Sequence, residues 1–295
     1  MDHKRISIDS LSAYYDFFPT LSSSPHNIAV YGFDQRGWGR SVKKSSENGL
    51  TGPTSLVLSD IHDFVLHVAS LTEAKGKPLF LMGHSMGGGE TLYYLLSSPP
   101  AFSNRPKLSG FLLEAPYIEL DPSEQPSFAK VLVGKLAALL LPNTQLKQKL
   151  DSTYMCHSAK VRQDWVDDPL CHDTGTLEGL KGLLQRAGDL STLSHGRHVL
   201  GIQTKLPCPV WLGHGTSDRV VSPEAAKRLF DVLAAPDGDK IYQAYPDAYH
   251  KLHAEPDGIA EQFAKDVAGW ILSHGKQPAT EHQPTKTGGE MKAKL

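Results

Sequence analysis

The chain has 295 residues, of which 40% are hydrophobic and 21% are charged, and its formal net charge is −2. Such a chain is long enough for one large α/β domain with an insertion. Its near-neutral charge gives no basis for nucleic-acid binding, and no apolar run is long enough to span a membrane. The start of the chain lacks a signal peptide's apolar core, and three cysteines without metal-ligand spacing fit a reducing compartment, so we expect a cytoplasmic protein.

The N-terminal quarter of the chain predicts one strand between two helices. Residues 1–12 are weakly patterned, with a brief alternation of polar and apolar residues at Arg5–Ile8. A short amphipathic helix is predicted over Ser12–Phe18, with its first residue as N-cap. The apolar run Ile28–Phe33 predicts a buried strand, which leads into a loop punctuated by glycines. A longer helix is predicted over Ser55–Leu71.

The motif Gly83-His84-Ser85-Met86-Gly87 lies between a strand-length apolar run and a helix that ends before Pro99. A G-x-S-x-G motif between a strand and a helix is typical of the nucleophile elbow of an α/β-hydrolase. The sharp turn needs small neighbours around the serine, and the Met86 N–H would bind a developing oxyanion at the start of the helix. The alternative is a glycine-rich turn in which Ser85 has no chemical role.

Apolar runs alternate with helices as far as another strand at Leu108–Ile118, which predicts a parallel sheet covered on both faces. From Leu120 to Leu206 no strand is predicted. This stretch contains the apolar helix Phe128–Leu141 and helical segments at Leu177–Leu190 and His195–Gln203. The apolar helix is interpreted as a buried core helix, as a lid over an apolar pocket, or as an interfacial helix that touches lipid.

Strands return at Pro209–Gly215 and Lys240–Tyr245, separated by a helix that Ser222 caps and Pro223 opens. A final helix carries apolar residues on one face from Ile259 to Ile271. The predicted fold class is therefore α/β, with a mostly parallel central sheet flanked by helices. Its predicted division is an α/β core over residues 1–119 and 206–275, a helical cap over 120–205, and a disordered polar tail over 276–295.

The chain order of a hydrolase triad, serine then acid then histidine, selects two further residues. Asp218 follows the penultimate predicted strand, and His250 follows the last one. His250 would take the proton of Ser85 as general base, while Asp218 would orient the imidazole and stabilise its cation. His253 is the alternative base, and His84 is expected to pack behind the turn. A metal site built on the histidines at 250 and 253 lacks a third ligand in the sequence.

Four motifs follow one another along the chain: DQRGWGRS at 34–41, GHSMGG at 83–88, HGTSDRVVSP at 214–223 and DAYHKLH at 247–253. In this combination and order the sequence resembles the fungal type of monoacylglycerol lipase, a serine-hydrolase group with a helical cap. The motif GHSMGG alone is shared with lysophospholipases and carboxylesterases, so the specificity comes from the combination. The likeness runs from about Ala13 to His274.

The resemblance implies hydrolysis of a monoacylglycerol to a fatty acid and glycerol, without a metal or an organic cofactor. The family's triad falls on Ser85, Asp218 and His250, and one oxyanion donor falls on the Met86 N–H. The implied partner is a small lipid ester, with peripheral contact of the cap to membranes or lipid droplets, and nucleic acid is not expected to bind. A lysophospholipase or a carboxylesterase of the same group is the alternative.

The sequence departs from the family at its N-terminus. The family carries strands before its first helix and a His-Gly pair whose loop supplies the second oxyanion N–H, and this chain matches neither. We expect a shortened chain in which two central strands keep unpaired backbone groups, with Lys4–Ile8 as the segment available to pair with them. The alternative function is accordingly a catalytically impaired hydrolase-fold protein that binds lipid or a protein partner.

Overall fold

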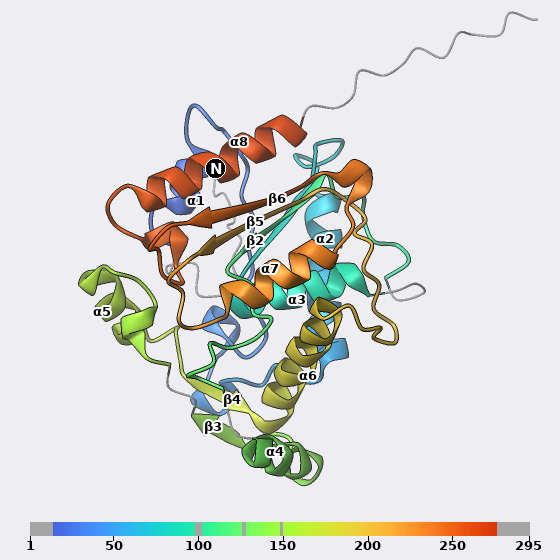
Figure 1. Ribbon diagram of the computed structural model, residues 1–295, viewed down its shortest axis with the longest axis vertical. Helices are drawn as coiled ribbons and strands as arrows, with labels where there is room; N and C mark the ends of the chain where they lie inside the picture. The colour runs from blue at the N-terminus through green and yellow to red at the C-terminus, as the bar shows by residue number, and fades with distance from the viewer. Residues whose placement is uncertain (1–13, 98–101, 126–127, 148–149, 276–295) are drawn as a thin grey trace, which may run out of the picture.

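The centre of the molecule is a parallel β-sheet. The computed structural model describes residues 14–97, 102–125, 128–147 and 150–275. In this part of the chain four strands pair in the order β1-β2-β5-β6, and each ladder between them is parallel (Figure 1). The strands are β1 (Phe80–His84), β2 (Gly110–Glu114), β5 (Val210–Gly215) and β6 (Lys240–Tyr245). The expected mostly parallel sheet is confirmed.

Helices cover both faces of this sheet, with α1 and α8 on one side and α2, α3 and α7 on the other (Figure 1). Leu112 of β2 packs with α1 and α8, whereas its neighbours Phe111 and Leu113 belong to the cluster under the other helices. A strand that is buried on both faces is a continuous apolar run, because successive side chains point to opposite sides. These helices are α1 (Phe17–Ser22), α2 (Thr54–Ser70), α3 (Ser85–Leu96), α7 (Pro223–Val232) and α8 (Ile259–His274).

The segment between β2 and β5 lies below the sheet in Figure 1 and contains helices and a small antiparallel sheet. The expectation of no strand here is wrong, because residues 145–147 pair with 174–176. The predicted helix at His195–Gln203 is also wrong, because Gly196 and Gly201 adopt φ angles of 70° and 80°, which an α-helix excludes. The elements are α4 (Phe128–Leu140), β3 (Gln145–Lys147), α5 (Ala159–Asp167), β4 (Thr174–Thr176) and α6 (Leu177–Ser194).

Local signals placed most of the predicted helices, but the prediction of the first helix over Ser12–Phe18 is wrong, because α1 covers Phe17–Ser22 and follows Asp16 as its N-cap. The predicted cap of α7 is present, since the Ala225 N–H donates to Ser222 Oγ at 3.1 Å and Pro223 is the first helical residue.

In the part of the chain that the structure describes, no helix has both the length and the apolar content to cross a bilayer. Short 3₁₀ turns complete the chain: η2 (Gly39–Ser41), η3 (Ser45–Glu47), η4 (Ser152–Tyr154), η5 (Pro236–Gly238) and η6 (Leu252–Ala254).

The run Ile28–Phe33, expected as a buried strand, is not a strand, and its residues are half-buried except for the exposed Ala29. An apolar run becomes a strand only where a neighbour pairs with its backbone, and no described strand lies beside it. Because the segment 28–33 does not pair with it, β1 is an edge of the sheet and is paired with β2 alone among the described strands. The expectations for residues 1–12 and 276–295 lie outside the described residues.

A buried ion pair joins α6 to the core. Arg186 Nη2 donates to Glu90 Oε1 of α3 at 2.6 Å, and both side chains are almost fully buried. Arg186→Met should lower the free energy of unfolding by about 3–5 kcal/mol, because it removes the cation from a buried carboxylate. Urea denaturation followed by circular dichroism measures this loss. Lys227→Met is the control, since its pair with Asp231 is exposed and should contribute less than about 1 kcal/mol. Equal losses in the two variants would contradict the prediction.

Candidate active site

Ser85 occupies a strained turn between β1 and α3. Its φ angle is 53°, in the left-handed region that residues with side chains rarely adopt. A Cβ at Gly83 would lie 2.4 Å from Thr91 Oγ1 and 2.5 Å from the Gly87 carbonyl oxygen, so the turn can close only with glycine there. The Tyr117 N–H donates to the Ser85 carbonyl at 2.8 Å and fixes the turn from the segment after β2. The strand–turn–helix context predicted for the motif is therefore present.

Three loops bring the sequence-predicted side chains together. Ser85 Oγ lies 2.8 Å from His250 Nε2, and His250 Nδ1 lies 2.8 Å from Asp218 Oδ2. With Nδ1–H donating to the carboxylate, Nε2 is left to accept the serine hydroxyl proton. These residues follow β1, β6 and β5 respectively, and parallel strands present their carboxyl ends at one edge of a sheet. The arrangement has the geometry of a nucleophile, a base and an orienting acid.

Asp218 is a buried carboxylate whose two oxygens accept four hydrogen bonds. Oδ1 accepts from the backbone N–H groups of Val220 and Val221 at 2.8 and 3.2 Å. Oδ2 accepts from His250 Nδ1 and from His214 Nε2, the latter at 3.0 Å. Burial acts to raise the pKa of the Asp218 carboxyl, but the two histidines outweigh burial and hold this pKa far below its ordinary value. The carboxylate therefore stays ionised at neutral pH.

The imidazole of His250 is also buried, and its environment keeps it neutral at neutral pH. Burial lowers the pKa of His250 below its ordinary value, while Asp218 acts in the opposite direction. His84 and His214 add to the lowering. A neutral imidazole beside a serine hydroxyl is the protonation state that general-base catalysis requires.

Met86 is the second residue of α3, directly after Ser85. The first N–H groups of a helix have no partner within it, and the helix dipole places partial positive charge at this end. The Met86 N–H is thus suitably situated for the oxyanion role expected from the sequence.

His253, the alternative base, points elsewhere. Its Nδ1 lies 2.7 Å from Glu114 Oε1 at the end of β2, and its backbone N–H donates to the same oxygen at 3.1 Å. Burial acts to raise the pKa of Glu114, but His253 and His84 outweigh it and lower this pKa to about 2. Sequence reasoning missed Glu114, and its one signal was a carboxylate at the end of an otherwise apolar strand.

Glu114, His84 and His253 are also a geometric candidate for metal ligation, with ligand atoms within 4.8 Å of one another. His250 does not belong to this group. His253 and Glu114 form hydrogen bonds with each other inside the protein, and His84 Nε2–H donates to the His250 carbonyl at 3.3 Å. We therefore interpret the cluster as a structural support for the loop that carries His250 and His253. His84 thus packs behind the turn, as expected.

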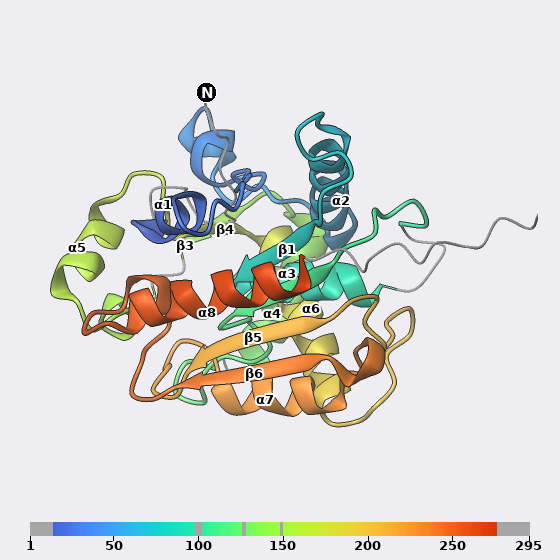
Figure 2. The same ribbon diagram turned by 90° about the horizontal axis from the view of Figure 1, so that it is seen from above.

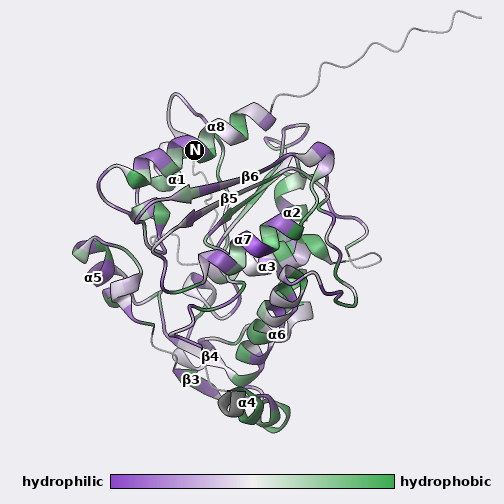
Figure 3. Ribbon diagram, in the orientation of Figure 1, coloured by the Kyte–Doolittle hydropathy of each residue, from purple (hydrophilic) through white to green (hydrophobic). Residues whose placement is uncertain are grey.

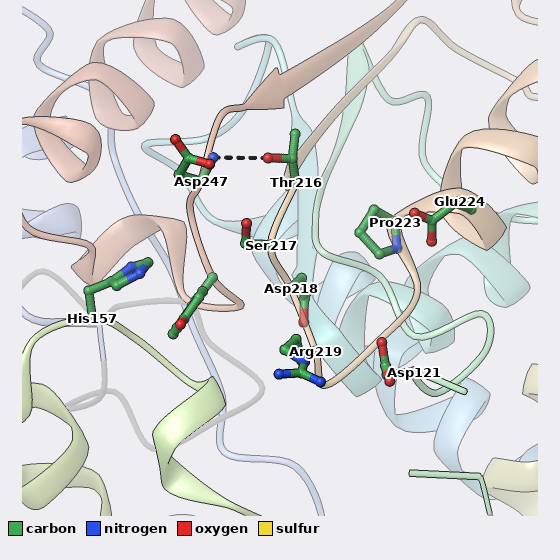
Figure 4. A pocket seen from close by; sticks show the side chains of 10 residues that line it. Asp121, His157, Thr216, Ser217, Asp218, Arg219, Pro223, Glu224 and Asp247 are labelled. Atoms are coloured by element: carbon green, nitrogen blue, oxygen red, sulfur yellow. Dashed lines mark hydrogen bonds between the residues drawn. The ribbon is translucent and has the colours of Figure 1, made fainter. Parts of the chain in front are cut away.

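A polar pocket of about 490 Å³ borders the acid side of the site (Figure 4). The Asp247 N–H donates to Thr216 Oγ1 at 2.9 Å beside it. Charged side chains dominate its lining, among them Asp121, Asp218, Arg219, Glu224 and Asp247. Such a lining suits water or a polar fragment rather than an acyl chain.

Comparisons with known proteins place the chain among hydrolases. Residues 8–257 match the model of the family described as serine aminopeptidase S33. A protein of Schizosaccharomyces pombe named "Putative monoglyceride lipase" is 34% identical over 283 residues, which cover 96% of this chain and 69% of the relative. The monoglyceride lipase of Homo sapiens is 27% identical over 263 residues, covering 88% of this chain and 78% of the relative.

Two solved structures share the fold. A soluble variant of monoglyceride lipase from Saccharomyces cerevisiae, in complex with a substrate analog, superposes with a TM-score of 0.78 at 24% identity, covering 93% of this chain and 88% of that chain. The monoacylglycerol lipase of Paleococcus ferrophilus gives 0.72 at 24% identity, covering 92% and 93%. The chain therefore belongs to the serine aminopeptidase S33 family of α/β-hydrolases, together with the monoglyceride lipases it resembles.

Proposed function

We propose that this protein is a serine hydrolase that cleaves a monoacylglycerol, or a similar small lipid ester, to a fatty acid and glycerol. The observation that carries the proposal is the pair of 2.8 Å contacts that link Ser85 to His250 and His250 to Asp218. The substrate class rests on the relative from Schizosaccharomyces pombe, which matches 96% of this chain, and on the human enzyme of the same printed activity.

The proposed chemistry uses side chains and backbone of this chain throughout. His250 Nε2 accepts the proton of Ser85 as Oγ attacks the ester carbonyl, and the Met86 N–H stabilises the negative charge that develops on the carbonyl oxygen. His250 then gives the proton to the departing glycerol oxygen, which leaves an acyl-enzyme. His250 then takes a proton from water, which attacks the acyl-enzyme, and returns this proton to Ser85 Oγ as the fatty acid is released. Asp218 remains ionised and stabilises the imidazolium in both halves.

The second candidate is a hydrolase-fold protein with impaired catalysis that binds lipid or a protein partner. Among the described strands, β1 is paired along one edge only, directly before Ser85, and this open edge favours the alternative. Losing one of two oxyanion donors typically costs about 10²–10³ in turnover. Labelling with a fluorophosphonate probe separates the candidates, because only a reactive Ser85 forms the covalent adduct. A folded protein that does not react with the fluorophosphonate probe would support the second candidate and contradict the first.

Removing the nucleophile or the base should abolish turnover. Ser85→Ala and His250→Ala should each lower kcat for monoacylglycerol hydrolysis by on the order of 10⁴–10⁶-fold, because the two residues act as a unit. Fatty-acid release measured by titration checks this, with Ser123→Ala as the control at an exposed serine. An active His250→Ala variant would reassign the base, and His253→Gln would then be the next variant to measure.

The rise of kcat/KM with pH on the acid side of its profile should follow the deprotonation of His250 to its neutral form. Since the pKa of His250 is lowered from the ordinary 6.5, kcat/KM should rise with pH along a limb whose midpoint lies below pH 6.5. His214 contributes to this lowering and donates to Asp218, so His214→Leu should move the acid limb to higher pH. It should also reduce kcat/KM at the plateau by about tenfold, the loss of roughly one hydrogen bond. His214→Gln, which can still donate, should retain more activity, and an unmoved limb in His214→Leu would refute this role.

Contact with a lipid surface is proposed for α4, whose ribbon is coloured mostly as hydrophobic in Figure 3 and lies at the end of the molecule opposite α8. Leu139 is 66% exposed and Leu140 is 83% exposed, while Ala138 faces the protein. A run of large apolar side chains open to solvent on one helix is typical of a docking face for lipid or protein. The exposed set comprises Leu132, Val133, Leu136, Leu139, Leu140 and Leu141.

The double variant Leu136→Glu/Leu139→Glu should weaken binding to phosphatidylcholine vesicles at least about tenfold, because each change replaces apolar burial with a charge. Co-sedimentation with vesicles measures the binding. Leu200→Glu is the matched control, since Leu200 is 92% exposed but lies outside α4. Hydrolysis of a water-soluble short-chain ester should be the same in all three proteins. Equal vesicle binding by the double variant and the control would rule out α4 as the lipid contact.

A further inference from the structure

Residues 155–157, in the segment between β2 and β5, lie against residues 249–255, the loop that carries His250. The Cys156 thiol donates to the Ala254 carbonyl at 3.2 Å, across 98 residues of sequence. Figure 1 and Figure 2 both show α5, which follows the first stretch, at the same end of the molecule as the start of α8, which follows the second. The two stretches are therefore packed together beside the base.

Both chain neighbours of the base are held by this contact. On one side, the ring of Tyr249 stacks on the ring of His157, with centroids 3.7 Å apart and planes inclined by 27°. On the other side, the Lys251 N–H donates to the Met155 carbonyl at 2.9 Å. The backbone is thus fixed immediately before and immediately after His250, and the position of the imidazole depends on residues that are far away in the sequence.

The buried carboxylate of Glu255 joins the two stretches. Its Oε1 accepts from the Tyr249 N–H at 2.8 Å. Its Oε2 accepts from the His157 ring Nδ1–H at 3.1 Å and from the His157 backbone N–H at 3.3 Å. A buried carboxylate needs hydrogen-bond partners, so the ring of His157 is held in one orientation although 44% of its side chain is exposed.

A small displacement of this loop would reach the chemistry. The His250 ring makes two contacts of 2.8 Å, one to Ser85 Oγ and one to Asp218 Oδ2. Both must persist while the proton passes from the serine to the imidazole and on to the leaving group. Since hydrogen bonds weaken steeply with poor geometry, a misplacement of about 1 Å can cost on the order of 100-fold in rate. Residues that fix the loop therefore act on turnover without taking part in proton transfer.

We propose that His157 is a positioning residue for His250, which it orients through Glu255 and through its stack on Tyr249. The inference rests on the proposed function, because it takes His250 as the general base. It gives the segment between β2 and β5 a part in turnover that is separate from lipid contact at α4. Two other roles are outcomes of the test: His157 stabilises the fold alone, or it touches the substrate from the polar pocket that it lines (Figure 4).

Three substitutions separate the contacts of His157. His157→Ala removes the ring donor and the stack, so kcat for a water-soluble short-chain ester should fall about tenfold while KM stays within about twofold. The base acts in both halves of the reaction, so kcat falls whichever half is slower. His157→Asn, whose amide can still donate to Glu255, should keep kcat within about threefold of the wild-type value. His157→Phe keeps only the stack and should lie between these two.

The measurement separates turnover from folding. We express kcat per active site, counted from the end point of titration with a fluorophosphonate, so that a loss of folded protein does not count as a loss of turnover. His198→Ala is the matched control, because it removes an exposed histidine outside the contact. NMR supplies a second readout. The His250 Nδ1–H proton, bonded to Asp218, should give a downfield signal that shifts or broadens in His157→Ala and is retained in His157→Asn.

A lower kcat per site in His157→Ala that His157→Asn recovers supports the positioning role. An unchanged kcat per site with a lower Tm would make His157 a structural residue, and a raised KM with unchanged kcat would make it a substrate contact. Either result overturns the proposal. If His157→Ala yields no titratable sites, a wild-type kcat per site in His157→Phe overturns the role through Glu255. Failure of the proposed function differs from all of these, because the wild-type protein itself would then not react with the fluorophosphonate.

Discussion

The geometry of this site depends on one ionised carboxylate held out of water. Asp218 is fully buried, and a buried charge is tolerated only where hydrogen bonds replace those of water. Two backbone N–H groups and two histidines provide this replacement, at distances between 2.8 and 3.2 Å. Because Oδ2 is shared, the same contacts that keep Asp218 ionised also fix the tautomer of His250. The protonation state of the base and the stability of the loop after β5 are therefore consequences of one arrangement.

The loop that carries His250 is held from two further sides, and again by buried carboxylates. Glu114, at the end of β2, accepts from the backbone and the ring of His253, three residues after the base. Glu255 accepts from the Tyr249 N–H at 2.8 Å, one residue before the base. The imidazole is thus positioned by contacts on each side of it along the chain, and it needs no rearrangement to reach Ser85. Such preorganisation reduces the cost of ordering catalytic groups during the reaction.

Sequence reasoning succeeded where the physical cause is local. The turn at Ser85 needs glycine on either side, and the cap at Ser222 needs a hydroxyl before the helix, so both leave marks within a few residues. Glu114 left no comparable mark, because its role depends on His253, which is 139 residues away in the chain and is brought into contact by the fold. The prediction of a strand at residues 28–33 is wrong for a related reason. Its apolar pattern is that of a strand, but a strand also needs a neighbour, and the local sequence contains no information about which backbone lies beside it.

β1 and Ser85 belong to one continuous segment of the chain, because Ser85 directly follows the last residue of the strand. Met82 is three residues before Ser85, and the strained φ of Ser85 persists only while the surrounding structure holds it. Among the described residues, β1 is held by hydrogen bonds to β2, by the small residues of the turn and by the Tyr117 N–H that donates to the Ser85 carbonyl. Loss of any of these contacts would lower the free energy of local opening at the turn and would reach Ser85 through the backbone of β1.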